Sequence, residues 1–336
     1  MNYRHVGKTG LRVSEISLGG WITLGGTIDR EHSDRIIDAA LGAGINFIDL
    51  ADVYANGRAE EVAGRAIAGR RRGDVVISSK VFWPMSKNPN DRGLSRKHII
   101  ESCEASLKRL GTDYLDLYFC HRWDEKTPLE ETVRAMEDLI RQGKVLYWGT
   151  SVWTAEQIAA ACSTAERFNA YAPVVEQPRY NLFDRHIEDD GVLAACRERG
   201  IGLVVWSPLA QGMLAGKYDQ GVPEGSRASE TKWLDGHLTD DNIRRSQQFS
   251  ALAREAGHEP GQVALVEHRR ARHGATLPFD GFGDVGDLLG DVVELHGFLL
   301  GAHVVDLPEV EAVGVHALEG LLEHGLGAGA GAVVAL

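Results

Sequence analysis

The sequence predicts an α/β fold built on a parallel sheet, and it favours a closed (β/α)8 barrel with a β-hairpin at its N-terminal end. Short apolar strands alternate with amphipathic helices through seven consecutive units, which is the pattern of a parallel sheet. The number of units approaches eight, and reactive side chains follow several different strands, as in barrels. An open doubly wound sheet also fits the alternation, although it more often gathers its ligand contacts at one switch point.

The strands are expected in short apolar runs. Residues 3–18 alternate polar and apolar side chains around Thr9-Gly10, which predicts the hairpin. The run 45–50 follows the helix-ending Gly44 and is apolar almost throughout, as expected of a strand buried on both faces. The strands of the sheet are expected near residues 15–19, 45–50, 75–80, 114–120, 146–151, 174–178 and 202–207.

Two of the intervening helices carry clear start signals. Thr127 with Glu130 three residues later predicts a capped helix that ends near Gly143. Thr154 with Gln157 repeats the same capping-box pattern. These signals place a helix after each of the corresponding strands, as a barrel requires.

The regular pattern ends near Val266. Residues 273–336 contain no Lys and no Arg, and the segment from Gly325 to Gly331 is close to low complexity. We therefore expect one barrel domain over residues 1–266 and an atypical Gly-rich segment over residues 267–336. No eighth strand and no closing helix can be assigned in that segment. A reading-frame slip or a replaced terminus would explain the change in composition.

Composition excludes several classes of function. The net charge of −12 argues against non-specific binding to nucleic acid or to an anionic membrane, which requires a basic surface. No apolar run reaches the roughly 18–20 residues of a membrane span. The N-terminal residues lack the apolar core of a signal peptide, which indicates the cytoplasm. The four cysteines have no zinc or redox spacing, so no metal site is expected.

Four reactive residues are expected at one rim of the sheet. Asp49 and Tyr54 follow the second strand, Lys80 closes the third, and His121 follows the fourth. A Lys in a buried strand is costly unless it is paired, and Asp49 is the available partner. A neighbouring Lys⁺ is expected to lower the pKa of the Tyr54 phenol from about 10, which favours a general acid that acts near neutral pH.

Each of these residues also has a purely structural interpretation. Asp49 alone fits a turn residue that begins a loop, and Tyr54 alone fits a half-buried aromatic side chain. The occurrence of all four at strand ends favours the functional interpretation. Together they are equipped to protonate a carbonyl oxygen while hydride arrives at carbon, with His121 holding the oxygen or tuning the Tyr.

Seven stretches match one known family in its order and spacing, namely Leu18–Trp21, Asn46–Tyr54, Gly93–Ile100, Tyr147–Ser151, Trp206–Leu209, Gly216–Tyr218 and Ser226–Ser229. Through them the sequence resembles the aldo-keto reductase superfamily, most closely the branch that contains potassium-channel β subunits and their bacterial relatives. The resemblance covers about residues 3–266 and implies a (β/α)8 barrel, NADPH as hydride donor and a catalytic tetrad. In that tetrad Tyr54 is the proton donor, tuned by Lys80, which pairs with Asp49, beside His121.

The same resemblance implies a set of cofactor contacts. Ser151 and Gln177 would hold the nicotinamide carboxamide, and Trp206 would lie against the ring. A loop over the pyrophosphate would offer its backbone N–H groups to phosphate, and two cations would add positive charge. The full set of implied cofactor-binding residues is Gly20, Trp21, Asp49, Ser151, Gln177, Trp206, Ser207, Pro208, Leu209, Gly212, Lys217 and Arg227.

Some of these residues again allow a simpler interpretation. Trp206 fits a core aromatic residue, and Lys217 and Arg227 fit solvated surface cations. Trp21, Trp83 and Trp123 could line an apolar substrate mouth or simply pack against the barrel rim.

The C-terminal segment departs from the family, which normally adds an eighth strand and a helix that grips the adenosine 2′-phosphate. The segment Gly281–Gly286 fits the dinucleotide fingerprint, with Asp306 about twenty residues further on, but no clean strand precedes it. We interpret this match as coincidental. His268 and His273 lack acidic or thiol partners in a metal-binding pattern and are interpreted as solvated.

Two functional hypotheses follow. The first is an NADPH-dependent enzyme that reduces aldehydes and ketones to alcohols, with a small carbonyl compound as its partner. The alternative is a nucleotide-sensing binding protein like the channel β subunits, or an inactive variant whose altered C-terminal segment impairs cofactor binding. The resemblance also implies a homo-oligomer, a tetramer or larger. The substrate, the preference for NADPH over NADH and any channel partner are left open.

Overall fold

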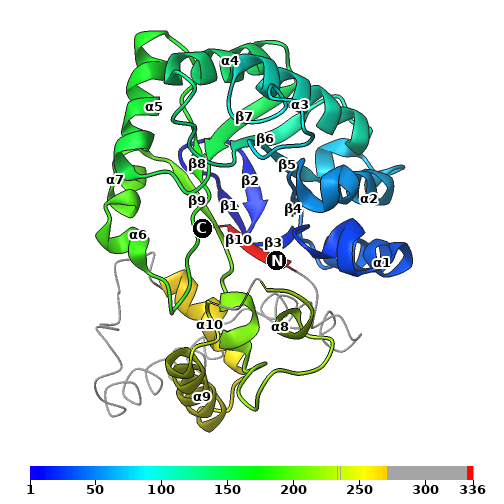
Figure 1. Ribbon diagram of the computed structural model, residues 1–336, viewed down its shortest axis with the longest axis vertical. Coiled ribbons are helices and arrows are strands. Elements are labelled where there is room, and N and C mark those ends of the chain that lie inside the picture. The colour runs from blue at the N-terminus through cyan, green and yellow to red at the C-terminus, as the bar shows by residue number, and fades with distance from the viewer. Residues whose placement is uncertain (233, 235, 271–330, 336) are drawn as a thin grey trace, which may run out of the picture. The chain divides into compact units, whose positions relative to one another are not determined.

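The computed structural model describes residues 1–232, 234, 236–270 and 331–335. Its main sheet closes into a barrel in the order β10-β3-β4-β5-β6-β7-β8-β9 (Figure 1). The predicted barrel is confirmed, and the alternative of an open sheet is wrong. The strands are β3 (Ile16–Gly19), β4 (Phe47–Asp49), β5 (Val76–Val81), β6 (Leu115–Cys120), β7 (Val145–Thr150), β8 (Val175–Glu176), β9 (Gly202–Trp206) and β10 (Gly331–Ala335).

All seven predicted strands are present as β3 to β9, and neighbours among them pair in parallel. The closing strand β10 was not predicted. It runs antiparallel to both neighbours, with Gly331 opposite Gly19 and Val333 opposite Trp206. Its run of small apolar residues stands in a Gly-rich segment without the alternation that reveals a strand. The fingerprint at 281–286, Asp306 and His273 lie outside the described residues.

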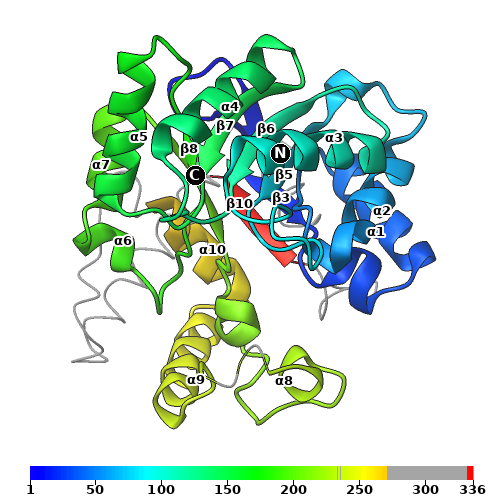
Figure 2. The same cartoon turned by 45° about the horizontal axis from the view of Figure 1, so that its top comes forward.

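The chain divides into two compact units. The first holds residues Met1–Arg179, His186–Trp206 and strand β10, and the second holds Tyr180–Arg185 and the described residues between 207 and 270. In the first unit helices surround the outside of the strands (Figures 1 and 2). These helices are α1 (Arg30–Gly42), α2 (Arg58–Ile67), α3 (Arg96–Leu110), α4 (Leu129–Arg141), α5 (Ala155–Arg167), α6 (His186–Asp189) and α7 (Val192–Arg199), with the short turns η1 (Thr23–Thr27), η2 (Tyr54–Gly57) and η3 (Arg72–Asp74).

Both predicted helices are present, but the expected N-cap is confirmed for one and wrong for the other. Thr154 and Gln157 form a complete capping box at the start of α5. Helix α4 instead has Pro128 at its N-cap and no side-chain capping bond. Thr127 does not cap it because its hydroxyl donates to Asp124 Oδ2 at 2.8 Å, which holds Thr127 in the preceding loop.

The N-terminal hairpin pairs β1 (Tyr3–His5) with β2 (Arg12–Ser14) and is confirmed. Two of its residues, Val6 and Val13, belong to the core cluster that also contains Phe47 and Leu117 from the barrel strands. Gly7 permits this packing, because a Cβ there would lie 2.4 Å from the carbonyl oxygen of Gly200. Because the hairpin packs against the barrel in this way, we expect a functional site at the opposite ends of the strands.

The second unit has its own apolar core, made by residues such as Met213, Leu214 and Phe249. Its helices are η4 (Ala210–Ala215), α8 (Arg227–Glu230), α9 (Asp240–Glu255) and α10 (Pro260–Arg270). The structure does not test whether a domain boundary lies at residue 266, so that boundary stays a prediction.

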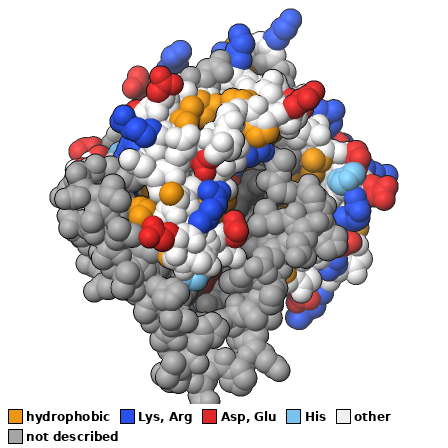
Figure 3. Space-filling model, turned by 90° about the horizontal axis from the view of Figure 1, so that it is seen from below, with side chains coloured by type: hydrophobic (Ala, Val, Ile, Leu, Met, Phe, Trp, Pro, Cys, Tyr) orange, Lys and Arg blue, Asp and Glu red, His pale blue; other side chains and the backbone are white. Residues whose placement is uncertain are grey.

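Within the described residues, no helix is both long and apolar enough to span a membrane. Acidic and basic side chains are interspersed over the face shown in Figure 3. Cys103, Cys120 and Cys196 are buried and Cys162 is half-buried, all as free thiols. Burial raises the pKa of Cys103 to about 12, as it does for Cys196. No group of three potential metal ligands occurs in the described part of the chain.

Candidate active site

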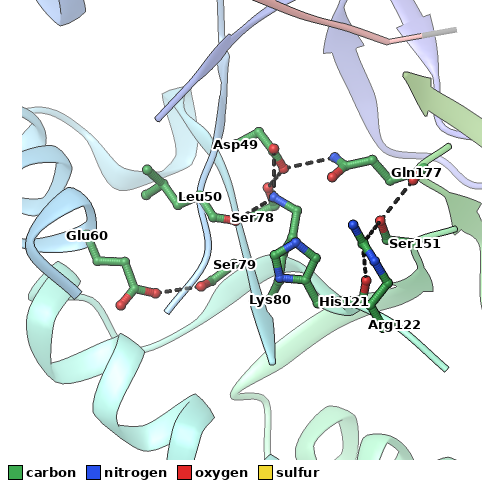
Figure 4. Close-up of polar contacts among 10 residues, drawn as sticks. All are labelled: Asp49, Leu50, Glu60, Ser78, Ser79, Lys80, His121, Arg122, Ser151 and Gln177. Carbon is green, nitrogen blue, oxygen red and sulfur yellow. Dashed lines mark hydrogen bonds and ion pairs between the residues drawn. The ribbon is translucent and has the colours of Figure 1, made fainter. Parts of the chain in front are cut away.

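A buried ion pair lies at the centre of the first unit. Lys80 Nζ is 2.7 Å from Asp49 Oδ2 and donates a second hydrogen bond of 2.7 Å to the carbonyl oxygen of Leu50 (Figure 4). The two charged side chains are 0% and 3% exposed. The ion pair expected from the sequence is therefore present, and neighbouring strands β4 and β5 supply its two members.

The pair is held in a defined orientation and charge state. Ser78 Oγ donates to Asp49 Oδ1 at 2.6 Å, and Gln177 Nε2 donates to the same oxygen at 3.1 Å. Burial alone would lower the pKa of Lys80, but the charges of Asp49 and Tyr54 outweigh that effect and raise the pKa. Lys80 is therefore a permanent cation at physiological pH.

Tyr54 lies beside this cation, with its ring centroid 4.9 Å from Lys80 Nζ. Its position follows from η2, where Ala55, Asn56 and Gly57 all have positive φ and turn the chain sharply after Tyr54. Contrary to expectation, the pKa of Tyr54 is raised, because burial outweighs the opposing attraction of Lys80 for the phenolate. The phenol therefore stays protonated at neutral pH, and Lys80 limits the cost of removing that proton.

His121 faces Tyr54 from the end of β6, with the ring centroids 6.0 Å apart. Burial lowers the pKa of His121 well below its ordinary value, and the charges of Lys80 and Arg122 add to the effect. The imidazole is thus neutral and carries one N–H. Its buried Nδ1 has no hydrogen-bond partner among the described residues, so a bound polar group is needed to satisfy it.

Three of the rim tryptophans lie close to these residues or to one another. Trp83 is 38% exposed and packs edge-on to His121, with centroids 6.2 Å apart. Trp21 and Trp206 make a similar contact at 6.3 Å. Trp123 packs at 4.7 Å against the buried Trp153, which is a packing role. Trp83 is therefore the aromatic residue that borders the reactive group.

The ends of β7 and β8 bring the two residues expected to hold a carboxamide into contact. Ser151 Oγ donates to the carbonyl oxygen of Gln177 at 2.9 Å, and the Gln177 amide reaches Asp49. Gly20 also lies at this rim, and its N–H donates to the Asp49 carbonyl oxygen at 2.9 Å. A Cβ on Gly20 would lie 2.6 Å from Leu50 Cδ2, so a larger residue there would have to displace the Leu50 side chain.

Glu176 was not predicted as a site residue. It is fully buried on β8 and accepts hydrogen bonds from Thr150 Oγ1 and from the N–H groups of Val152 and Trp153. Burial raises its pKa to about 7, against those hydrogen bonds. Val152 has a φ of 58°, which is strained for a β-branched residue. Glu176 therefore fixes the turn that carries Ser151.

Arg122 was also missed, although it directly follows His121 in the sequence. Its Nη1 donates to the His121 carbonyl oxygen and to Ser151 Oγ, the latter at 3.4 Å (Figure 4). The guanidinium carbon is 5.7 Å from the Trp83 ring centroid. Its position directly after a candidate catalytic histidine was the sequence signal that could have identified Arg122.

The remaining predicted cofactor residues, Ser207, Pro208, Leu209, Gly212, Lys217 and Arg227, lie in the second unit. There the turn after Ser207 contains several positive φ angles, including 57° at Ser207 and 104° at Gly212. Burial lowers the pKa of Lys217, and nearby Arg227 lowers it further. Burial also lowers the pKa of Arg227. Two partly desolvated cations close together favour an anionic ligand.

Comparison with known proteins identifies close relatives. The chain is 47% identical over 272 residues to a probable voltage-gated potassium channel subunit beta from Oryza sativa subsp. japonica, an alignment that covers 79% of this chain and 83% of the relative. A protein of the same description from Arabidopsis thaliana has the same identity and coverage. A putative voltage-gated potassium channel subunit beta from Schizosaccharomyces pombe is 45% identical over 277 residues, with 79% of each chain covered.

The family model for aldo/keto reductases matches residues 15–266. That range spans the seven parallel strands and all four residues of the predicted tetrad. With the barrel, the arrangement at its rim and these relatives in agreement, the chain belongs to the aldo/keto reductase family.

Proposed function

We propose that this protein reduces aldehydes and ketones to alcohols with NADPH as the hydride donor. Membership of the aldo/keto reductase family supports oxidoreductase activity with a nicotinamide dinucleotide. The observation that carries the finer proposal is the buried Lys80–Asp49 pair beside a protonated Tyr54 and a neutral His121.

The chemistry divides among these residues. A bound nicotinamide would supply the hydride. Tyr54 donates its phenolic proton to the carbonyl oxygen, and Lys80 stabilises the phenolate that remains, 4.9 Å from the ring centroid. Asp49 keeps Lys80 charged and in place. His121, neutral and with one N–H, orients the carbonyl oxygen by donating a hydrogen bond.

The residues present fit a nicotinamide dinucleotide. Ser151 and Gln177 offer a hydroxyl and an amide to a carboxamide, and the unsatisfied Nδ1 of His121 calls for a polar ligand. Trp206 offers an aromatic surface to the ring. The second unit, by itself, contains two neighbouring cations suited to an anion, Lys217 and Arg227. The preference for NADPH over NADH is proposed on these two cations.

The direct test is Tyr54→Phe, which removes the proton donor and retains the ring. We expect turnover of a carbonyl substrate to fall by roughly two to four orders of magnitude, the usual range for loss of a general acid. Quenching of tryptophan fluorescence should show that NADPH binds to the variant nearly as it binds to the parent. Tyr171→Phe is the matched control, because Tyr171 is 60% exposed. Undiminished turnover in Tyr54→Phe would refute the proposed role.

A second candidate function is a nucleotide-sensing subunit, favoured by the names of the relatives, which are described as channel β subunits. A channel partner retained in pull-downs from a native extract, together with negligible turnover, would favour it. NADPH titration addresses the third hypothesis, an inactive variant, because a folded chain that does not bind NADPH cannot be either of the others. We propose a cytoplasmic location and a homo-oligomer for both functional candidates.

A further inference from the structure

Arg122 is a half-buried cation at the edge of the candidate active site that lacks a carboxylate partner. Within the described residues no carboxylate oxygen lies within ion-pair distance of its guanidinium, in contrast to Lys80. Its two acceptors, the His121 carbonyl oxygen and Ser151 Oγ, are neutral. Arg122 is partly buried, and this burial lowers the pKa of its guanidinium.

Most of the donor capacity of this guanidinium is unused. Only Nη1 makes hydrogen bonds to the described residues. Neither Nε nor Nη2 is among the buried polar atoms left without a partner, so both remain accessible to a ligand. Three N–H groups on a planar fork match the two oxygens of a carboxylate or of a phosphate.

Among the described basic side chains around the candidate site, Arg122 is the one whose positive charge is not balanced by an ion pair. Lys80 is balanced by Asp49, and His121 is neutral. The charges of Tyr54 and, to a smaller extent, Glu176 oppose the effect of burial on the pKa of Arg122. Neither side chain is within ion-pair or hydrogen-bond distance of it, and the Glu176 oxygens already accept from Thr150, Val152 and Trp153. The charge of Arg122 also reaches Tyr54, where it lowers the phenol pKa against the larger effect of burial.

The position of Arg122 connects this charge to the reacting group. It follows His121 in the chain, contacts Ser151, and lies 5.7 Å from the centroid of Trp83, which in turn packs on His121. A substrate whose carbonyl oxygen approaches Tyr54 and His121 therefore lies near the partly buried guanidinium of Arg122. A net charge of −12 makes such a local cation valuable, because the protein as a whole repels anions.

We propose that Arg122 is a specificity residue that selects carbonyl substrates bearing an anionic group, a carboxylate or a phosphate, close to the carbonyl. The guanidinium fork binds the anion and Trp83 covers the carbon chain beside it. This inference rests on the proposed reductase function.

The test compares pairs of carbonyl substrates whose main difference is charge. Glyoxylate is paired with methylglyoxal, 4-oxobutanoate with its methyl ester, and phosphonoacetaldehyde with its dimethyl ester. We expect the parent protein with NADPH to have the higher kcat/KM for the anionic member of both carboxylate pairs, of the phosphonate pair, or of all three. In Arg122→Met that ratio should fall about ten- to a hundredfold, as expected for the loss of a charge-assisted hydrogen bond. For Arg122→Lys, which keeps the positive charge but lacks the planar guanidinium, the kcat/KM ratio should lie between those of the parent and of Arg122→Met.

Controls separate this role from its alternatives. Arg167→Met is the matched control, because Arg167 is an exposed arginine paired with Glu130. If Arg122→Met weakens NADPH binding and leaves the substrate ratio unchanged, Arg122 serves the cofactor and the inference is overturned. If Arg122→Met does not fold, the parent still decides the matter, since added salt should raise KM for the anionic member alone. A salt response shared by both members would contradict the inference.

The two proposals can also fail separately. Reduction of both members of every pair without preference overturns the specificity of Arg122 and leaves the reductase proposal standing. Reduction of no carbonyl compound in either class, by a protein that binds NADPH, overturns both. Preference within the carboxylate pairs only, or within the phosphonate pair only, supports the inference and identifies which anion the site takes.

Discussion

Strand β5 carries polar side chains on both of its faces, and the two faces have different roles. On the inner face Ser78 and Lys80 meet Asp49 (Figure 4). On the outer face Ser79 donates to Glu60 of α2, and Glu60 is paired with Arg109 of α3 at 2.6 Å. We call these the inner and outer clusters. Both are buried, and each combines a hydroxyl group with an ion pair.

The difference lies in what surrounds each ion pair. The inner cluster borders Tyr54 and His121, whose buried Nδ1 awaits a partner. The outer cluster closes on itself between helices, with Ser106 contacting Arg109 and no reactive group beside it. Buried charge alone therefore does not mark an active site. What distinguishes the inner cluster is that a phenol and an imidazole, those of Tyr54 and His121, lie beside its ion pair.

The largest effect that separates the clusters is expected from Lys80→Met. Loss of the cation leaves Asp49 buried and uncompensated, which should lower the free energy of unfolding by about 3–5 kcal/mol and abolish turnover. Urea unfolding and steady-state kinetics measure the two effects. Adding Asp49→Asn should recover part of the stability and none of the turnover. Recovery of turnover in the double variant would contradict a chemical role for the inner cluster.

Arg109→Met makes the equivalent break in the outer cluster. Glu60 is then left fully buried with Ser79 as its remaining partner, so stability should fall by about 3 kcal/mol. Turnover of the folded protein should stay at the parental level, because no member of the outer cluster reaches Tyr54. The kinetics are measured below the unfolding transition. A loss of turnover as large as that of Lys80→Met would erase the distinction between the clusters.

A smaller effect is expected from Asp52→Asn, at the edge of the outer cluster. Asp52 accepts from Ser102 Oγ at 2.7 Å, but its buried Oδ1 has no partner among the described residues. Burial raises its pKa from 3.8 to about 7, against the bond from Ser102, and nearby Glu60 adds to the rise.

The folded state thus holds this proton more tightly than the unfolded state does. Its stabilising contribution is complete below about pH 4 and is lost as the pH rises through about 7. In Asp52→Asn, the free energy of unfolding measured with urea should therefore decrease less between pH 4.5 and 8 than it does in the parent. Glu176 titrates in the same range and should preserve part of the slope. Asp138→Asn, an exposed carboxyl paired with Arg96, is the control. An unchanged slope in Asp52→Asn would show that Asp52 stays ionised when folded.

The main course of the fold could be predicted because parallel strands here are apolar runs that stop at a reactive residue. Lys80 and His121 each close such a run, so their shared rim followed from the order of the strands. The N-cap of α4 was harder to predict from the sequence, because Asp124 competes for the hydroxyl of Thr127. Strand β10 was missed because small residues leave no pattern of burial in the sequence.

The sequence could not predict pKa shifts, because these depend on distances and burial in the folded structure. The sequence placed Lys80 near Tyr54 but could not weigh its attraction against the desolvation of the phenol, which prevails. Glu176 precedes a predicted ligand, Gln177, yet points to the other side of the same strand and supports Val152. The separation of Lys217 and Arg227 into a second compact unit also appears only in three dimensions.

The two clusters also bear on how β5 finds its alignment in the sheet. Val76, Ile77 and Val81 are all buried, so apolar side chains face both sides and burial alone hardly distinguishes one register from the next. A shift by one residue would turn Lys80 outward and bring Ser79 to Asp49, leaving a carboxylate in the interior without its cation. The same charges that hold the candidate site together therefore also penalise mispaired strands during folding.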